Sequence, residues 1–172
     1  MTIGPLEFLD GPVRLQEYDA RWPEQFAREE QRIRDALGNR VLRLEHVGST
    51  SVPGLVAKPR IDILLVVADA TDEASYVPAL EAAGYTLRVR EPDWHEHRRF
   101  NRSDMELNLH VFGPDSPEIE RLLRFRDRLR SHTADRERYA AAKRELAARH
   151  WHHMQDYADA KSGVIEAILA HG

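Results

Sequence analysis

A turn of small and hydroxyl residues, followed by a single carboxylate, separates two apolar runs near the first third of the chain. The turn, GSTSVPG, includes Gly48, Ser49 and Thr50, and the run that follows it, IDILLVV, contains Asp62. Glycine lets a ligand approach the backbone closely, and successive amides in such a turn form a concave site for an anion. A carboxylate buried without a partner costs free energy, so Asp62 is expected to face a cleft, a cation or a hydrogen-bond donor. The pattern predicts a site for phosphate and a metal ion.

Positive charge lies close to this turn, at Lys58 and Arg60 in the connecting segment AKPRID. Both side chains could bind phosphate beside the hydroxyl of Ser49. The alternative interpretation is a turn closed by glycine and proline, in which the hydroxyls bond only their own backbone. The sequence contains no G-x-x-x-x-G-K-[ST], G-x-G-x-x-G or G-x-S-x-G motif, which excludes the familiar phosphate loops and the serine nucleophile elbow.

Nine histidines are many for 172 residues. His46 precedes the turn, His97 lies in the segment DWHEHRRF, and His110 shares one face of an alternating run with Asn108. These side chains could line one cleft and ligate a transition metal or contact phosphate. The alternative is that they are hydrogen-bonded or exposed histidines without a ligand. The group RHWHHM, residues 149–154, is interpreted as a chance cluster between two helices because it lacks the H-E-x-x-H spacing.

Hydrophobic periodicity divides the chain into the helices and strands that must position these residues. Apolar alternation and continuous apolar runs predict strands over residues 13–18, 42–47, 61–67, 85–91, 96–102 and 105–113. Helical spacing predicts helices over residues 20–37, 71–84, 134–149 and 155–170, and another from residue 116. Asp72 and Ser116 are expected to cap two of them. This order predicts the α+β class: one domain over residues 1–172, with a small mixed sheet packed by helices and a helical C-terminal tail.

Composition excludes several other classes of protein. Hydrophobic residues at 42% and charged residues at 31% are ordinary for a globular domain. The net charge of −4 argues against general nucleic-acid binding, and the absence of cysteine excludes disulfides and thiolate chemistry. The longest apolar run, ILLVVA, is too short to span a membrane, and the first residues do not resemble a secretory signal. The expected location is the cytoplasm, with no membrane partner.

The segment LRLEHVGSTSVPGLVAKPRIDILLVV closely resembles the hallmark segment of the GrpB family. The segments YDARWPEQFAREEQRI, LNLHVF and YADAKSGVIEAIL extend the resemblance over nearly the whole chain. The family is placed in the nucleotidyltransferase superfamily, so the resemblance implies a DNA polymerase β-like fold. It also implies that a G-S turn holds a nucleoside triphosphate, while acids on two strands bind two Mg²⁺ ions.

The resemblance assigns roles to particular positions of this chain. Gly48 and Ser49 match the G-S turn, and Asp62 matches the first acid. Leu64 occupies the position of the second acid, and Glu106 is the acid nearest to the expected third position. Two-metal catalysis needs carboxylates that bridge and neutralise both ions. Because side chains two residues apart on a strand point the same way, an aspartate at position 64 is expected to lie beside Asp62 and to strengthen Mg²⁺ binding.

The last helix supplies a further phosphate candidate. The resemblance favours Lys161, which lies one helical turn after Tyr157 on the same face. Lys58, Arg60 and Lys161 would then offset the negative charge of the phosphates. Arg126 and Asp127 are weaker candidates, because charged residues on a helix surface need no special explanation.

Two functions remain open at this point. The first is a nucleotidyltransferase-like protein that binds a nucleotide with Mg²⁺ and transfers a nucleotidyl group to an unidentified acceptor. The second is a non-catalytic module that binds a nucleotide or another phosphorylated small molecule and has lost the two-metal site. Leu64 discriminates between them, because it weakens the case for an enzyme without affecting the case for binding.

Overall fold

The computed structural model describes residues 1, 3, 8–11 and 13–170. Five strands form a mixed sheet in the order β2-β3-β6-β5-β4, in which only the β3–β6 pair is parallel. Their bounds are Arg43–Val47 for β2, Ile61–Val66 for β3, Leu107–Phe112 for β6, His97–Arg102 for β5 and Tyr85–Glu91 for β4. This sheet, with its helices, confirms the predicted α+β class.

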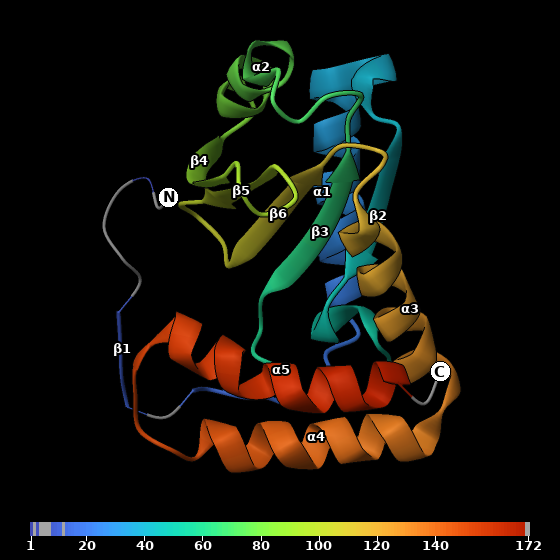
Figure 1. Cartoon of the computed structure of the whole chain (residues 1–172), viewed down its shortest axis with the longest axis vertical. Helices are drawn as coiled ribbons and strands as arrows, with labels where there is room; N and C mark the ends of the chain where they lie inside the picture. Colours follow the sequence, from blue (N-terminus) through green and yellow to red (C-terminus); the bar gives the residue numbers. More distant parts are fainter. Residues whose placement is uncertain (2, 4–7, 12, 171–172) are drawn as a thin grey trace.

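The described part of the chain contains five α-helices, which lie above, beside and below the sheet in Figure 1. They are α1 (Trp22–Leu37), α2 (Val77–Ala82), α3 (Pro117–Ser131), α4 (Thr133–Ala147) and α5 (Met154–Ala170). In Figure 1, α4 and α5 run side by side below the sheet, and α5 lies between the sheet and α4. A separate antiparallel pair joins β1 (Phe8–Gly11) to β7 (Trp151–His153).

One face of the sheet packs against α1 and α2. Ile61, Ile63 and Leu65 of β3 share a buried cluster with residues of α1 and α2, among them Ile33 and Leu80. Strand alternation sends the even-numbered residues of β3 to the opposite face. Because both faces of β3 are largely covered, its sequence is almost continuously apolar, as is typical of a central strand.

The opposite face of the sheet is covered only in part. Leu64 and Val66 pack there with Phe112 and with Ile119 and Leu123 of α3. Toward the start of β3, the same face carries Asp62 together with the polar side chains of β6. The apolar part of this face is the part that α3 covers. Polar residues occupy the part of the sheet that α3 does not reach.

The alternating pattern of β6 was predicted correctly. Leu107, Leu109 and Val111 belong to the core shared with α1, while Asn108 and His110 lie on the other face. Helix α3 also begins as expected, since the hydroxyl of Ser116 accepts a hydrogen bond of 3.3 Å from the backbone N–H of Glu118.

Two local expectations were wrong, and one further segment contains a strand that was not predicted. Residues 13–18 form no strand; this segment makes only an isolated bridge between Gln16 and Ala57, and Val13 donates to the carbonyl of Ala147 instead. The helix expected over 71–84 is divided into a 3₁₀ turn, Glu73–Ser75, and α2, and Asp72 makes no side-chain cap. The group RHWHHM lies between α4 and α5, as expected, and also contains the strand β7. For residues 13–18 and for β7, pairing with a distant segment decided the outcome.

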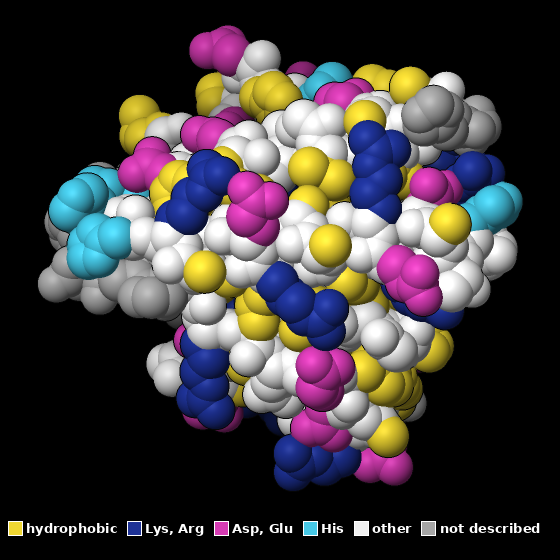
Figure 2. Space-filling model, turned by 90° about the horizontal axis from the view of Figure 1, so that it is seen from below, with side chains coloured by type: hydrophobic (Ala, Val, Ile, Leu, Met, Phe, Trp, Pro, Cys, Tyr) yellow, Lys and Arg dark blue, Asp and Glu magenta, His cyan; other side chains and the backbone are white. Residues whose placement is uncertain are grey.

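The underside of the molecule carries a mixed charge. Figure 2 shows Lys and Arg side chains interspersed with Asp and Glu, with only small hydrophobic areas between them. This mixture is typical of a solvated helical surface and offers no extended basic face for nucleic acid. Within the described ranges, no helix combines the length and the apolar character needed to cross a membrane.

Candidate functional site

The glycine–serine turn lies directly against Asp62. Gly48 has φ +72° and ψ −175°, a conformation that is almost restricted to glycine. A Cβ atom at this position would lie 2.5 Å from Oδ2 of Asp62, which is far inside a van der Waals contact. The missing side chain of Gly48 therefore makes room for the carboxylate, and the sequence-based prediction that the turn and Asp62 share one site agrees with this contact.

His46 and Thr50 support the turn from inside. The Thr50 hydroxyl donates to the carbonyl of Arg60 at 3.1 Å, and Nε2 of His46 donates to that hydroxyl at 3.0 Å. The imidazole of His46 stacks on Phe26 with a centroid separation of 4.9 Å, and burial lowers its pKa to about 4. Both side chains are buried and neither lines the cleft, in contrast to the prediction that Thr50 contacts phosphate and His46 faces the ligand.

Ser49 contacts Lys143, a residue that the sequence did not identify as part of the site. Nζ of Lys143 in α4 donates to Oγ of Ser49 at 2.7 Å and to the carbonyl of Val56 at 2.9 Å. The side chain of Lys143 is 2% exposed, and burial, with the nearby charge of Lys161, holds its pKa well below the usual value. An amine from the C-terminal half of the chain thus lies at the centre of the turn.

Lys143 and Lys161 share a sequence signal. Each follows a tyrosine by four residues, and each ammonium lies over that ring, at 5.3 Å for Tyr139 and 4.6 Å for Tyr157. The prediction for Lys161 used this Y-x-x-x-K spacing, and the same spacing could have identified Lys143. Burial lowers the pKa of Lys161 to about 8, although the carboxylate of Asp62 favours its charged form. Two lysines on neighbouring helices therefore approach the turn together.

Asp62 of β3 has two polar neighbours on β6. It is the cross-strand neighbour of Asn108, and Nε2 of His110 is 3.4 Å from its Oδ1. Burial alone would raise the pKa of Asp62, but hydrogen bonds from His110 and Asn108 and the charges of His110 and Arg60 hold it below its usual value. The carboxylate is therefore ionised at neutral pH and suited to bind a cation.

A row of hydrogen bonds connects Asp62 to the far edge of the sheet. Nε2 of His97 is 3.0 Å from Nδ1 of His110, and Nδ1 of His97 is 2.9 Å from the carboxylate of Glu91. Because a carboxylate only accepts, Nδ1 of His97 carries a proton. Burial and the charge of His110 lower the pKa of His97 to about 2, so this ring is neutral. The predicted grouping of His97 with His110 agrees with this geometry.

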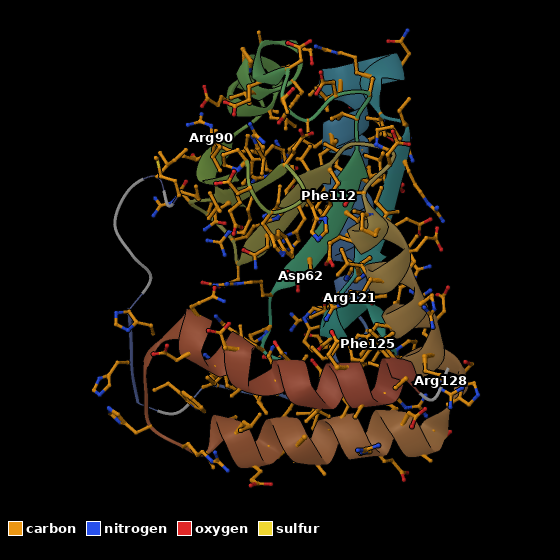
Figure 3. All side chains as sticks on the ribbon, in the orientation of Figure 1. Asp62, Arg90, Phe112, Arg121, Phe125 and Arg128 are labelled. Atoms are coloured by element: carbon orange, nitrogen blue, oxygen red, sulfur yellow. The ribbon has the colours of Figure 1, made fainter. Side chains whose placement is uncertain are left out.

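These residues line one cleft of about 1460 Å³ between the sheet and the C-terminal helices. Of the six predicted phosphate contacts, four line the cleft and two, Gly48 and Thr50, do not. The four are Ser49, Lys58, Arg60 and Lys161. The four sheet residues predicted for the site also belong to the lining: Asp62, His97, Asn108 and His110. Lys143 adds a further amine. Figure 3 shows Asp62 at the end of β3 nearest to α5, with Arg121 of α3 on the same side.

Glu106 lies outside this lining, in contrast to the prediction that it binds a metal beside Asp62. Its carboxylate pairs with the guanidinium of Arg60 at 2.7 Å, and 57% of its side chain is exposed. Leu64 does not border the cleft either, because α3 covers it and its exposed fraction is 0%. These apolar surroundings argue against the expectation that an aspartate at position 64 would join Asp62 in a metal site, although the side chain points to the same face of the sheet as Asp62.

The weaker helix candidates have structural contacts. Arg126 donates to the carboxylate of Glu45 at 2.7 Å and to the carbonyl of His46 at 3.1 Å, which ties α3 to β2. Asp127 pairs with Arg126 at 2.9 Å. Neither residue lines the cleft.

The donor set near Asp62 fits one divalent cation better than two. Across the described ranges, no group of three or more His, Asp or Glu is arranged to hold a metal ion. Two-metal catalysis needs several bridging carboxylates, and here Asp62 is the acid that lines this part of the cleft. Mg²⁺ is often held by one or two carboxylates plus the phosphates of its ligand, so a single ion arriving with a polyphosphate is compatible with Asp62.

The sheet, the turn and the helices together define a nucleotidyltransferase-like fold. The Cid1 poly(U) polymerase, in a structure with MgGTP bound, superposes with a TM-score of 0.50 at 12% identity, over 73% of this chain and 44% of the polymerase. At this identity the likeness concerns the fold alone.

The family follows from closer relatives. A family model described as GrpB protein matches residues 12–171, and the chain therefore belongs to the GrpB family. The crystal structure of the conserved protein GrpB from Enterococcus faecalis superposes with a TM-score of 0.72 at 27% identity, covering 90% of this chain and 98% of that one. A UPF0157 protein of Halalkalibacterium halodurans is 57% identical over 98% of this chain and 87% of its own length. The resemblance read from the sequence is thus confirmed.

A dephospho-CoA kinase of Mycolicibacterium paratuberculosis is also similar, at 33% identity. The match covers 80% of this chain but only 40% of that kinase. The whole kinase therefore contains a large part that this chain lacks.

Proposed function

We propose that the cleft binds a nucleotide or another phosphorylated small molecule, with the phosphates at the glycine–serine turn and a divalent cation at Asp62. The observation that carries this proposal is the meeting of Ser49 and Lys143, which are 94 residues apart in sequence and 2.7 Å apart in space. The contact brings a buried amine to a turn whose glycine lies against the carboxylate of Asp62. Lys58, Arg60 and Lys161 line the same cleft and would offset the charge of the phosphates.

Buried polar atoms without partners support a ligand in this cleft. Oδ1 of Asn101, Oδ1 of Asn108 and the hydroxyl of Tyr157 have no hydrogen-bond partner, and all three residues line the cleft. Such atoms are uncommon in folded proteins, because each unsatisfied group costs about 1–3 kcal/mol. All three atoms are buried in the ligand-free cleft, so a polar ligand would satisfy them once their side chains turn toward it.

A second candidate function is transfer of a nucleotidyl group to an acceptor. It is favoured by the nucleotidyltransferase-like fold and by Asp62 at the position of the first acid. The buried Leu64 leaves Asp62 without the second carboxylate that two-metal transfer uses. Binding is therefore the function that the site supports better. Incubation with a labelled nucleoside triphosphate and Mg²⁺ separates the two: transfer that is lost in Asp62→Asn would establish the enzyme.

Lys161→Met is expected to weaken binding of ATP and of pyrophosphate by roughly tenfold or more, because one charge-assisted contact contributes about 1.5–3 kcal/mol. Isothermal titration calorimetry with and without Mg²⁺ measures the loss. Arg28→Gln is the matched control, because Arg28 is an exposed cation on α1, which covers the other face of the sheet. Equal affinities in wild type and Lys161→Met would place the anion elsewhere.

The affinity for ATP is expected to fall as pH rises through about 8, the pKa of Lys161. The amine carries its charge below that pH and loses it above, so attraction to phosphate is present at pH 7 and weakened at pH 9. Calorimetry from pH 7.5 to pH 9.5 tests this. Lys161→Arg keeps its charge throughout and corrects for titration of ATP itself. The same slope in wild type and Lys161→Arg would show that Lys161 is not responsible.

The similarity to a protein named dephospho-CoA kinase is consistent with binding of a phosphorylated molecule. The shared part is only 40% of that protein. The partner we propose is a small phosphorylated molecule rather than nucleic acid or a membrane. A cytoplasmic location stays a prediction.

A further inference from the structure

We propose that Asp62, Asn108 and His110 form a site for one divalent transition-metal cation that accepts nitrogen, with Zn²⁺ as its probe, in place of a pair of Mg²⁺ ions. The inference rests on the proposed function, because it names the kind of cation that would accompany the phosphates. It starts from the position of the missing second acid. Leu64 of β3 lies directly opposite His110 of β6 in the sheet register. The neighbouring strand therefore supplies an imidazole beside Asp62.

The spacing of the two donor atoms suits a shared cation. Oδ1 of Asp62 and Nε2 of His110 are 3.4 Å apart, which is long for a charge-assisted hydrogen bond. Metal–ligand bonds of about 2.1 Å at a tetrahedral angle place two donor atoms roughly 3.4 Å apart. Both side chains are partly exposed to the cleft, at 27% for Asp62 and 24% for His110, so a cation can reach them.

A second layer of hydrogen bonds orients the His110 ring. The carboxylate of Glu91 accepts from Nδ1 of His97, so the neutral His97 ring has only Nε2 left as an acceptor for Nδ1–H of His110. Nε2 of His110 then points toward Asp62 and the cleft; in the metal-free protein it donates a hydrogen bond to the carboxylate, and a cation would take the place of that proton. Metal-binding histidines are commonly fixed in this way through their other ring nitrogen. Stacking of His97 on Phe112, with centroids 4.9 Å apart, holds the row in place.

Asn108 provides an independent observation. It is 9% exposed, it lies opposite Asp62 in the register, and its Oδ1 has no hydrogen-bond partner. An amide oxygen is an acceptable metal ligand. The Asn108 amide donates to Asp62 in the metal-free protein, and a half-turn of this amide would bring Oδ1 to a cation beside Asp62. One carboxylate, one amide oxygen and one imidazole form a mixed set, and the imidazole favours first-row transition metals over Mg²⁺. Phosphate oxygens or water would complete the coordination.

The test titrates the full chain with ZnCl₂ and, separately, MgCl₂ without nucleotide. His110→Ala is expected to weaken Zn²⁺ binding at least about tenfold while leaving weak Mg²⁺ binding unchanged, and His97→Gln is expected to weaken Zn²⁺ binding about 10–100-fold. His152→Ala is the control, because His152 is exposed and its ring lies 5.1 Å from that of His150, a pair that could bind Zn²⁺ at the surface. The proposal would be overturned if His152→Ala lost Zn²⁺ binding while His110→Ala and His97→Gln retained it.

X-ray absorption of Zn²⁺-loaded His152→Ala protein keeps the proposal testable if the His110 variant does not fold. Imidazole scattering in the metal shell is expected, and a shell of oxygen alone would overturn the site. If ATP binds but Zn²⁺ does not, the metal inference fails and the proposed function stands. If Zn²⁺ binds but neither ATP nor pyrophosphate does, the proposed function fails.

Discussion

Gly48→Ala is expected to lower the free energy of unfolding by about 3 kcal/mol or more and to abolish ATP binding. The backbone at Gly48 has φ +72°, and a non-glycine residue in this region costs about 1–3 kcal/mol. The added Cβ would also lie 2.5 Å from Oδ2 of Asp62, so the carboxylate or the turn must move. Urea unfolding measures the stability, and calorimetry measures ATP binding.

Gly54→Ala is the matched control for this variant. Gly54 lies in the same turn segment with φ +81°, but a Cβ there would meet no atom within 4 Å. It should therefore show the backbone cost without the clash and should retain ATP binding. Equal losses of stability and binding in both variants would show that the contact with Asp62 has no particular importance.

Leu64→Asp is expected to lower the free energy of unfolding by about 5 kcal/mol or more, enough to unfold much of the protein. The side chain of Leu64 is fully buried among Val66, Phe112 and two residues of α3. Truncation of a buried leucine alone costs about 2–5 kcal/mol, and a buried carboxylate without a partner adds to this cost. Urea unfolding measures the loss.

Mg²⁺ distinguishes this expectation from the one based on sequence. Alternation alone predicts that an aspartate at 64 would bind Mg²⁺ with Asp62 and recover stability in millimolar Mg²⁺. Because α3 separates position 64 from the cleft, no recovery is expected. Leu64→Ala is the control that isolates the cavity. If Mg²⁺ restored the stability of Leu64→Asp but not that of Leu64→Ala, α3 would have to move away from position 64, and the two-metal interpretation would be correct.

Local patterns predicted much of the fold. The alternation in β6 correctly separated the core residue Leu109 from the cleft residues Asn108 and His110, because strand side chains alternate whatever the strand pairs with. Local patterns gave wrong predictions where a segment's hydrogen-bond partners are distant in the sequence. Residues 13–18 alternate like a strand, but their backbone hydrogen bonds go to Ala57 and to Ala147 at the end of α4 rather than to a neighbouring strand. A strand needs a neighbour for its hydrogen bonds, and no local pattern identifies that neighbour.

The sequence by itself determined the family, the fold class and the small turn beside an acid, because these depend on short-range spacing and on apolar periodicity. Tertiary structure decided which polar residues share the cleft. It placed Lys143 on Ser49 and His110 against Asp62, turned Thr50 inward and paired Glu106 with Arg60. The physical reason is that a hydrogen bond or an ion pair acts over about 3–4 Å, whereas these partners are separated by tens of residues and meet only after the apolar faces of the sheet and helices have packed.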